Sequence, residues 1–265
     1  MGYSQWVEEL TVDELGIDFI RLRFLQADIH AKYLRDMLQS SLEAFHNHLY
    51  DLLGHQTTFR LSTCDSDIDL LPMLQNMPVL KNIQILEIVG SDLNETQLEE
   101  ILCSTTSIDC LSLVSLGNWI IPELGEKQGP MATKIMKYFN GRHAFVKEPN
   151  IQTTDVIQFL NTWRTGEKFL NLEVMSFDTL GSTFQIPDIR RSVEFKEVGT
   201  EVEYSFVRRF ATIALLPAQF PPQFRSHLYM VRQSDGHVAS VMLTDSGIFM
   251  GVWNMTEKEF LEKFQ

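Results

Sequence analysis

The sequence predicts an α/β protein with leucine-rich-repeat-like helix–strand repeats in its middle and an antiparallel β meander at the C-terminus. Three observations lead to this prediction. An apolar strand spacing recurs at a short interval, a helix-and-strand segment recurs further along the chain, and the C-terminal third consists of short apolar runs separated by turn residues.

The first repeat consists of two segments with the spacing L-x-x-L-x-L, which places the last two side chains on one face of a short strand. The segments are Ile83, Leu86 and Ile88, and Ile108, Leu111 and Leu113, and each pair of equivalent positions keeps the same displacement. Between them, Asn94 and Gln97 are typical of a helix N-cap and its capping partner, and Leu98, Ile101 and Leu102 follow at helical spacing. A strand–turn–helix unit of about 20–29 residues has the leucine-rich-repeat period.

A second copy lies in residues 150–177, which repeat the pattern of residues 91–115. Four helix positions share one constant displacement: Leu93, Leu98, Ile101 and Leu102 correspond to Ile151, Val156, Phe159 and Leu160. The strand positions, now Leu172, Met175 and Phe177, are displaced further, because the helix-to-strand connection is six residues longer. Chance matching of apolar residues is the alternative. The shared displacement favours a repeat, and we expect six side chains to be buried on neighbouring strands: Leu86, Ile88, Leu111, Leu113, Met175 and Phe177.

Upstream of the repeats, residues 1–58 are predicted to form an N-terminal cap. Residues 17–25 alternate like a strand, and residues 31–54 form a long amphipathic helix that ends at Gly54. Its apolar positions, expected to pack on the first repeat strand, are Leu34, Leu38, Leu42, Phe45 and Leu49. Phe59 and Leu61 then predict a strand, and residues 68–80 a short helix interrupted by prolines.

The C-terminal region, residues 181–265, contains four apolar runs typical of strands: 204–216, 228–232, 237–243 and 248–253. Asp235-Gly236 and Ser246-Gly247 are typical of hairpin turns between the last three runs. Thr256 and Glu259 form a capping box that opens a final helix. The boundary with the repeat region, residues 59–180, is expected within residues 178–200, which mix glycine, proline and charge.

Composition excludes several functions. The chain has 22 basic and 35 acidic residues, a net charge of −13, so phosphate backbones and anionic membrane surfaces repel it.

The chain has three cysteines, Cys64, Cys103 and Cys110, an odd number without CxxC spacing. This argues against a zinc site or a disulfide scaffold, and it predicts that the cysteines are small buried hydrophobic residues in a protein of a reducing compartment. Without a secretory signal, a myristoylation pattern or a spanning run, we expect a soluble cytoplasmic or nuclear protein.

No stretch predicts catalytic, cofactor-binding or metal-binding residues, so we expect a protein that is not an enzyme and needs no cofactor. Gly125 and Gly129 are separated by three residues and Pro130 follows, which differs from a P-loop and predicts a surface loop. The histidines at positions 46, 48 and 55 lack the spacing of a metal site. Arg208-Arg209 could receive an acidic partner or phosphate, although a strand arginine pair more often forms salt bridges.

Two short motifs stand out within roughly residues 60–255. The first comprises Asp155, Phe159-Leu160, Trp163, Gly166 and Leu172-Glu173. The second comprises Arg232, Asp235-Gly236, Ala239, Val241, Phe249 and Val252-Trp253. Together they resemble the nematode F-box-associated domain, type 2, with a gap after Gly166 about one residue longer than the family pattern. We expect Trp163 and Trp253 to be core residues.

The resemblance implies a protein-interaction domain, similar to the substrate-recognition part of an F-box protein in a cullin-RING ubiquitin ligase. Residues 1–50 lack the Leu-Pro pair and the helix spacing of an F-box. We therefore expect the Skp adaptor and cullin to be partners only if an F-box is supplied elsewhere. The alternatives are a stand-alone sequestering binder, decoy or antidote-like, and an enzyme of unrecognised type. The resemblance carries over no substrate-binding residues.

Overall fold

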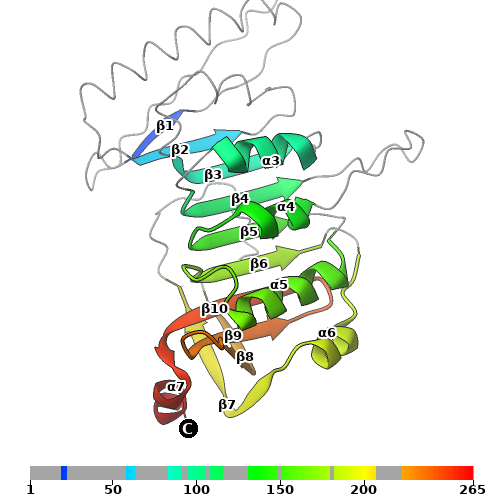
Figure 1. Ribbon diagram of the computed structural model, residues 1–265, viewed down its shortest axis with the longest axis vertical. Coiled ribbons are helices and arrows are strands. Elements are labelled where there is room, and N and C mark those ends of the chain that lie inside the picture. The colour runs from blue at the N-terminus through cyan, green and yellow to red at the C-terminus, as the bar shows by residue number, and fades with distance from the viewer. Residues whose placement is uncertain are drawn as a thin grey trace, which may run out of the picture.

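The computed structural model describes residues 19–22, 58–63, 83–90, 95–104, 108–115, 131–147, 151–179, 182–206 and 223–264 (Figure 1). Within them a mixed α/β fold is built on one ten-stranded sheet with the strand order β1-β2-β3-β4-β5-β6-β10-β9-β8-β7. The helices predicted over 31–54 and 68–80 lie outside the described residues.

The first six strands are parallel and follow one another in sequence order. They are β1 (Phe19–Leu22), β2 (Thr58–Thr63), β3 (Ile83–Gly90), β4 (Cys110–Ser115), β5 (His143–Lys147) and β6 (Val174–Asp178). Helices α3 (Glu95–Ser104), α4 (Met131–Tyr138) and α5 (Thr153–Thr165) connect β3 to β6 and cover one face of the sheet (Figure 1). Parallel neighbours need such crossovers because the chain must return to the same end of the sheet.

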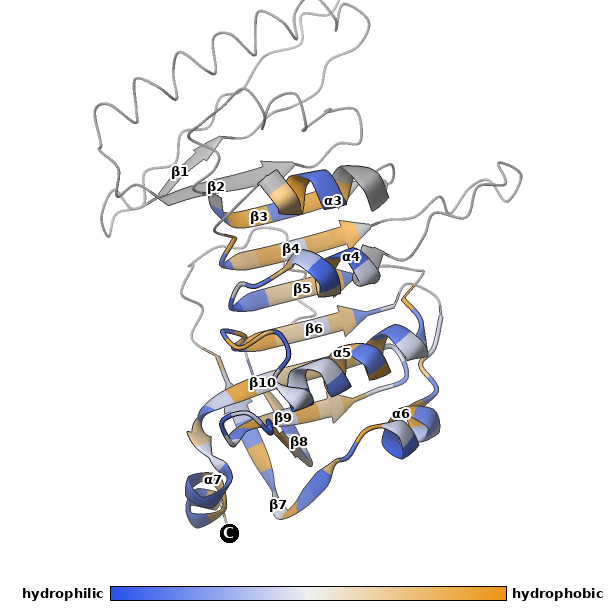
Figure 2. Ribbon diagram, viewed as in Figure 1, coloured by the Kyte–Doolittle hydropathy of each residue, from blue (hydrophilic) through white to orange (hydrophobic). Residues whose placement is uncertain are grey.

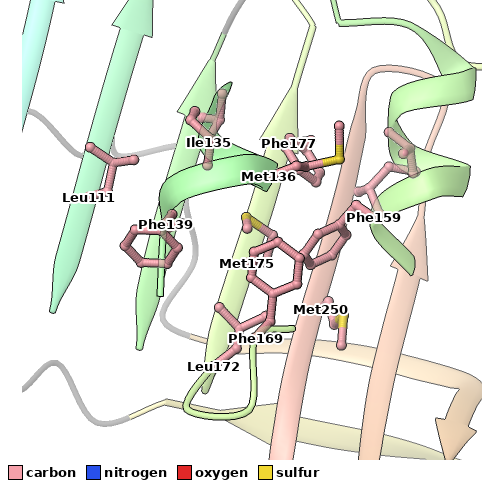
Figure 3. Packing of buried hydrophobic residues seen from close by; sticks show 14 of the residues in the cluster. Leu111, Ile135, Met136, Phe139, Phe159, Phe169, Leu172, Met175, Phe177 and Met250 are labelled. Atoms are coloured by element: carbon pink, nitrogen blue, oxygen red, sulfur yellow. The ribbon is translucent and has the colours of Figure 1, made fainter. Parts of the chain in front are cut away.

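Two rows of apolar side chains cross the parallel strands beneath these helices. In one row Leu86 pairs with Leu111, and in the other Ile88 pairs with Leu113. The rows continue through Ala144 and Val146 of β5 to Met175 and Phe177 of β6. The six residues expected on neighbouring strands are indeed buried in these rows, with β5 inserted between β4 and β6. Figure 3 shows Leu111, Met175 and Phe177 beneath α4 and α5.

Helix α4 and strand β5 were not predicted from the sequence. The matching positions of β4 and β6 are far apart in sequence because β5 lies between the two strands. The sequence separation from Leu111 to its partner Ala144 is similar to that from Ala144 to its partner Met175. Helix α4 and the turn after it bury Ile135, Met136 and Phe139. These three positions share one constant displacement from Phe159, Leu160 and Trp163 of α5. The unit was missed because β5 contributes the small Ala144 where its neighbours carry leucine and methionine.

The C-terminal strands are β7 (Lys196–Ser205), β8 (Gln223–Val231), β9 (His237–Leu243) and β10 (Gly247–Thr256). The last three pair antiparallel, as predicted, but β7 begins before the first predicted strand run, 204–216, most of which lies outside the described residues. Strands β8, β9 and β10 pair in sequence, with Gly236 at a φ of +75° in the first turn. The last helix, α7 (Glu257–Phe264), begins at the predicted capping box, in which the backbone N–H of Thr256 donates to Glu259 Oε2 at 2.7 Å.

The two predicted regions share the sheet because β10 pairs antiparallel with β6, placing Gly251 opposite Val174. The stretch 178–200, predicted to be a boundary, contains α6 (Ile186–Ser192) and the beginning of β7. Helix α6 contributes Ile189 to the same core as α5, so this stretch is packed. Figure 2 shows apolar residues along β3, β4 and β6, whereas α6 and α7 are mostly hydrophilic.

On the sheet face opposite the helices, Tyr204 of β7 crosses over β10. Its hydroxyl donates to the carbonyl oxygens of Glu173 at 2.9 Å and Val252 at 3.2 Å. A Cβ at Gly251 would lie 2.2 Å from the Tyr204 ring, so the absence of a side chain at this glycine allows the ring to approach the strand closely. The sheet therefore has a second apolar cluster on this face, with Phe145, Val174, Tyr204 and Phe224 among its members.

Candidate functional site

Most of the candidates weighed from the sequence lie outside the described residues. These are Cys64, His46, His48, His55, Gly125, Gly129, Arg208 and Arg209. Of the remaining cysteines, Cys110 is buried as expected, but Cys103 is exposed near the end of α3, so its expectation was wrong. The described part of the chain contains no group of three or more His, Cys, Asp or Glu side chains placed to hold a metal ion.

The two sequence motifs, within residues 155–173 and 232–253, come together at the end of α5. Trp163 on α5 is fully buried, and the Arg232 guanidinium lies 5.2 Å from its ring centroid. The backbone N–H of Gln233 donates to the carbonyl oxygen of Arg164 at 2.8 Å. Ser234 lies against Gly166, where a Cβ would come within 2.2 Å of the serine hydroxyl. Gly166 also ends α5 with a φ of +78°, a left-handed conformation suited to glycine. The end of α5 and the turn after β8 therefore form one packed junction around Trp163 and Arg232, whereas Phe249 and Trp253 of the second motif pack near Tyr204 and Phe224.

Arg232 is the central side chain of this junction and is only 3% exposed. Burying a guanidinium is costly unless its N–H groups are satisfied. Here Nε and Nη2 donate to the Asp235 carboxylate at 3.0 and 2.7 Å. Nη1 donates to the carbonyl oxygens of Phe169 at 3.3 Å and Leu170 at 3.2 Å. The guanidinium thus joins the turn between β8 and β9 to the loop between α5 and β6.

Asp235 is held as a carboxylate. The hydrogen bonds from Arg232 keep its pKa well below the ordinary value, with a smaller contribution from the backbone N–H of His237. His237 Nδ1 lies 3.0 Å from Asp235 Oδ2. Because Asp235 is committed to these partners, it serves to order the turn and not to transfer protons.

The α5–β6 loop, Gly166–Glu173, carries an unusual backbone position. Phe169 has a φ of +62° although it is not glycine, and its buried ring packs on Phe159 with centroids 5.1 Å apart. The next residue, Leu170, points into solvent and is 53% exposed. Leu172 is buried again, and its N–H donates to the carbonyl oxygen of Phe169 at 3.1 Å. Buried side chains on both sides therefore fix the exposed tip. Phe169 and Leu170 were not identified from the sequence, because no sequence pattern predicts that a phenylalanine will adopt a left-handed backbone conformation.

A polar group lies where the parallel strands begin. His143 of β5 is buried, and its Nε2 is 3.1 Å from Glu173 Oε2. Arg142 contacts the same carboxylate at 3.7 Å and Asp109 at 3.3 Å. A histidine–carboxylate pair can move a proton, but the histidine here is 2% exposed and its ring packs edge-on against Phe145 and Phe206. The arrangement favours a structural ion-pair network over an acid–base centre.

A second polar cluster joins α3 to α4 on the outer side of the helices. Glu99 accepts hydrogen bonds from Lys134 and from the Tyr138 hydroxyl, and Lys137 lies 3.5 Å from it. The hydrogen bonds from Lys134 and Tyr138 lower the pKa of Glu99 to about 2. The cluster binds neighbouring helices to each other at the surface.

Comparison of the chain with protein-family models, with curated proteins and with solved structures gave no match. None of the helices in the described residues is both long and apolar enough to cross a membrane.

Proposed function

We propose that this chain is a non-enzymatic protein-interaction domain that acts like the substrate-recognition part of an F-box protein in a cullin-RING ubiquitin ligase, in the cytoplasm or nucleus. One observation carries the proposal. The two sequence motifs that resemble the F-box-associated domain are separated along the chain by β6, α6, β7 and β8, yet Trp163 of the first packs on Arg232 of the second. This contact supports the interpretation that the two motifs belong to one domain.

We further propose that β3 to β6, with α3, α4 and α5, form leucine-rich-repeat-like units. The in-register rows of apolar residues and the helices gathered on one face support this assignment. Each unit contacts its sequence neighbour, so the array presents an extended surface. Such surfaces suit recognition of another protein more than chemistry on a small molecule.

Affinity purification of the tagged full chain from its native organism, followed by mass spectrometry, tests the ligase role. Recovery of the Skp adaptor and a cullin together with a further protein is the expected result if an F-box is supplied in the same assembly. Recovery of one stable partner without adaptor or cullin overturns the ligase role and favours a sequestering binder. A chain that retains no protein above an unrelated tagged control contradicts the interaction function altogether.

A direct binding assay addresses the adaptor separately. Because residues 1–50 lack the F-box pattern, the purified chain is expected not to retain purified Skp adaptor at micromolar concentration. Retention that disappears when residues 1–54 are removed contradicts this expectation and places an adaptor-binding element in the N-terminal segment.

A further inference from the structure

The turn between α4 and β5 contains Asn140-Gly141, and no other asparagine in the sequence is followed by glycine. In an Asn-Gly pair the main-chain nitrogen of the glycine can attack the side-chain carbonyl carbon of the asparagine. Larger residues after asparagine slow this reaction, because a side chain crowds the nitrogen and restricts the backbone. Asn140 lies outside helix and strand and is exposed, so water reaches its side chain.

The two reacting groups take no part in the hydrogen bonds that hold the rest of the turn. The N–H groups of Arg142 and His143 donate to the carbonyl oxygen of Asp109 at 2.7 and 2.9 Å. Within the described part of the chain, the Gly141 N–H donates to no carbonyl oxygen and the Asn140 side chain forms no hydrogen bond. No bond to the protein therefore has to break before the nitrogen meets the side-chain amide.

The packing of the turn explains why glycine occupies position 141. A Cβ there would lie 2.3 Å from the carbonyl oxygen of Ile108 and 2.7 Å from that of Asp109. Because both contacts are with backbone atoms, a larger residue would push the start of β5 away from β4. The fold therefore requires the glycine, whereas the exposed side chain before it has no packing role.

We propose that Asn140 is a site of spontaneous deamidation in the folded protein. The Gly141 nitrogen bonds to Cγ of Asn140, the bond from Cγ to the side-chain nitrogen breaks, and that nitrogen leaves as ammonia with the proton of the Gly141 N–H. The product is a cyclic succinimide. Water then opens one of the two C–N bonds of the ring, which gives aspartate or isoaspartate. Water is consumed and ammonia released, and no oxidant, reductant or enzyme takes part.

The two products differ in their effect on β5. Both add a negative charge beside Arg142, which contacts Asp109 at 3.3 Å and Glu173 at 3.7 Å. Isoaspartate also adds a carbon atom to the main chain, directly before a glycine that is packed against the Ile108 carbonyl. We expect isoaspartate to loosen the pairing of β5 with β4 and aspartate to leave it intact.

The test follows the reaction in the purified full chain during incubation in mildly alkaline buffer at physiological temperature. Brief digestion with trypsin releases the peptide Tyr138–Arg142. Mass spectrometry detects replacement of its amide nitrogen by oxygen, and chromatography separates aspartate from isoaspartate. The same chain unfolded in guanidinium chloride gives the reference rate. Asn140→Gln, which would have to form a larger and less favourable ring, is the unreactive control.

The ratio of the two rates decides the proposal. A reaction that required global unfolding would be slower in the folded chain by about a thousandfold or more, because the unfolded fraction of a stable protein is about one in a thousand or less. We expect the folded chain to react faster than this limit. A rate at or below the limit overturns the proposal.

Asp235-Gly236 provides an internal comparison, because Asp-Gly pairs isomerise through the same succinimide. Here the Gly236 N–H donates to the carbonyl oxygen of Arg232 at 2.8 Å, and the carboxylate accepts from the Arg232 guanidinium at 2.7 Å. We expect folding to slow isomerisation at Asp235 far more than deamidation at Asn140. Equal slowing at both sites contradicts the role assigned to the Gly141 N–H.

Urea unfolding of the separated products tests the effect on β5. The isoaspartate form is expected to unfold at a lower urea concentration than the unreacted chain. Asn140→Asp, which has the charge without the longer main chain, is expected to show no shift. A midpoint for the isoaspartate form equal to that of Asn140→Asp contradicts the predicted loosening.

Discussion

The parallel strands β1–β6 and the antiparallel strands β7–β10 belong to one sheet but are assembled differently. In the parallel part each strand pairs with the strand that follows it in sequence. In the antiparallel part the order is reversed, so the last strand, β10, joins β6 and the first, β7, ends at the far edge. The comparison teaches that each step of the parallel part joins strands that are neighbours in sequence, whereas the pairing of β10 with β6 joins residues about 70 positions apart, and contacts between more distant residues are slower to form.

The largest expected effect is at the junction. Trp163→Ala removes a fully buried indole that packs on Arg232, and we expect it to lower the free energy of unfolding by about 3–5 kcal/mol. Urea unfolding followed by circular dichroism measures the loss, with exposed Gln158→Ala on the same helix as the control, expected within about 0.5 kcal/mol. Two separate transitions in the wild-type chain, with only one shifted by Trp163→Ala, would show that the two parts are not one cooperative unit.

The second prediction concerns the opposite face of the sheet, where Tyr204 packs on β10. Gly251→Ala places a methyl group 2.2 Å from the Tyr204 ring, so the ring or the strand must move. We expect a loss of about 1–3 kcal/mol in the free energy of unfolding. Gly199→Ala on β7 is the matched control, because a Cβ there meets nothing within 4 Å. Equal effects of the two substitutions would contradict the close packing of Tyr204 on β10.

The third prediction is pH-dependent. The pKa of Asp235 is lowered on folding, so its ion pair with Arg232 contributes stability above the ordinary value of 3.8 and loses it as the pH falls further. Asp235→Asn is expected to cost about 1 kcal/mol at neutral pH, a modest figure because the carboxylate is partly solvent-exposed. Chemical denaturation at several pH values should show this difference shrinking below pH 3.8, whereas a difference that persists undiminished in acid contradicts the ion-pair account.

The smallest effect is expected at the end of the antiparallel part. Thr256→Ala removes the hydroxyl that bonds Glu259 Oε2 at 2.8 Å at the start of α7. We expect a loss of about 0.5–1 kcal/mol, measured as a lower midpoint of thermal unfolding. Thr183, exposed before α6, offers a control substitution to alanine. A loss above that of Gly251→Ala would mean that α7 supports the sheet more than its short length suggests.

Much of the parallel part was predictable because its contacts recur at regular sequence intervals. The spacing of Leu86 and Leu111 predicted a pair of side chains that the sheet aligns in register. Helix α7 and the turn at Gly236 were predictable for a related reason, since capping boxes and left-handed glycines depend on residues only a few positions apart.

Predictions failed where the deciding contact was distant in sequence. The motif residues Trp163 and Arg232 were noticed separately, yet only the folded chain brings the guanidinium onto the indole and its N–H groups onto the α5–β6 loop. The exposed tip at Leu170 was missed for the same reason, because burial of Phe169 and Leu172 decides which side chain of an apolar stretch faces water.

The sequence by itself determined the α/β class, the rows of apolar residues beneath the helices and the antiparallel order of the last three strands. Each of these depends on periodicity or on turn residues within a short window. Only the tertiary structure decided that β10 completes the sheet beside β6, that Tyr204 closes over Gly251 and that Arg232 fixes a loop distant from it in sequence. Many strand pairings have similar local propensity, and the free energy that separates them comes from packing and hydrogen bonds between residues that only the complete fold brings together.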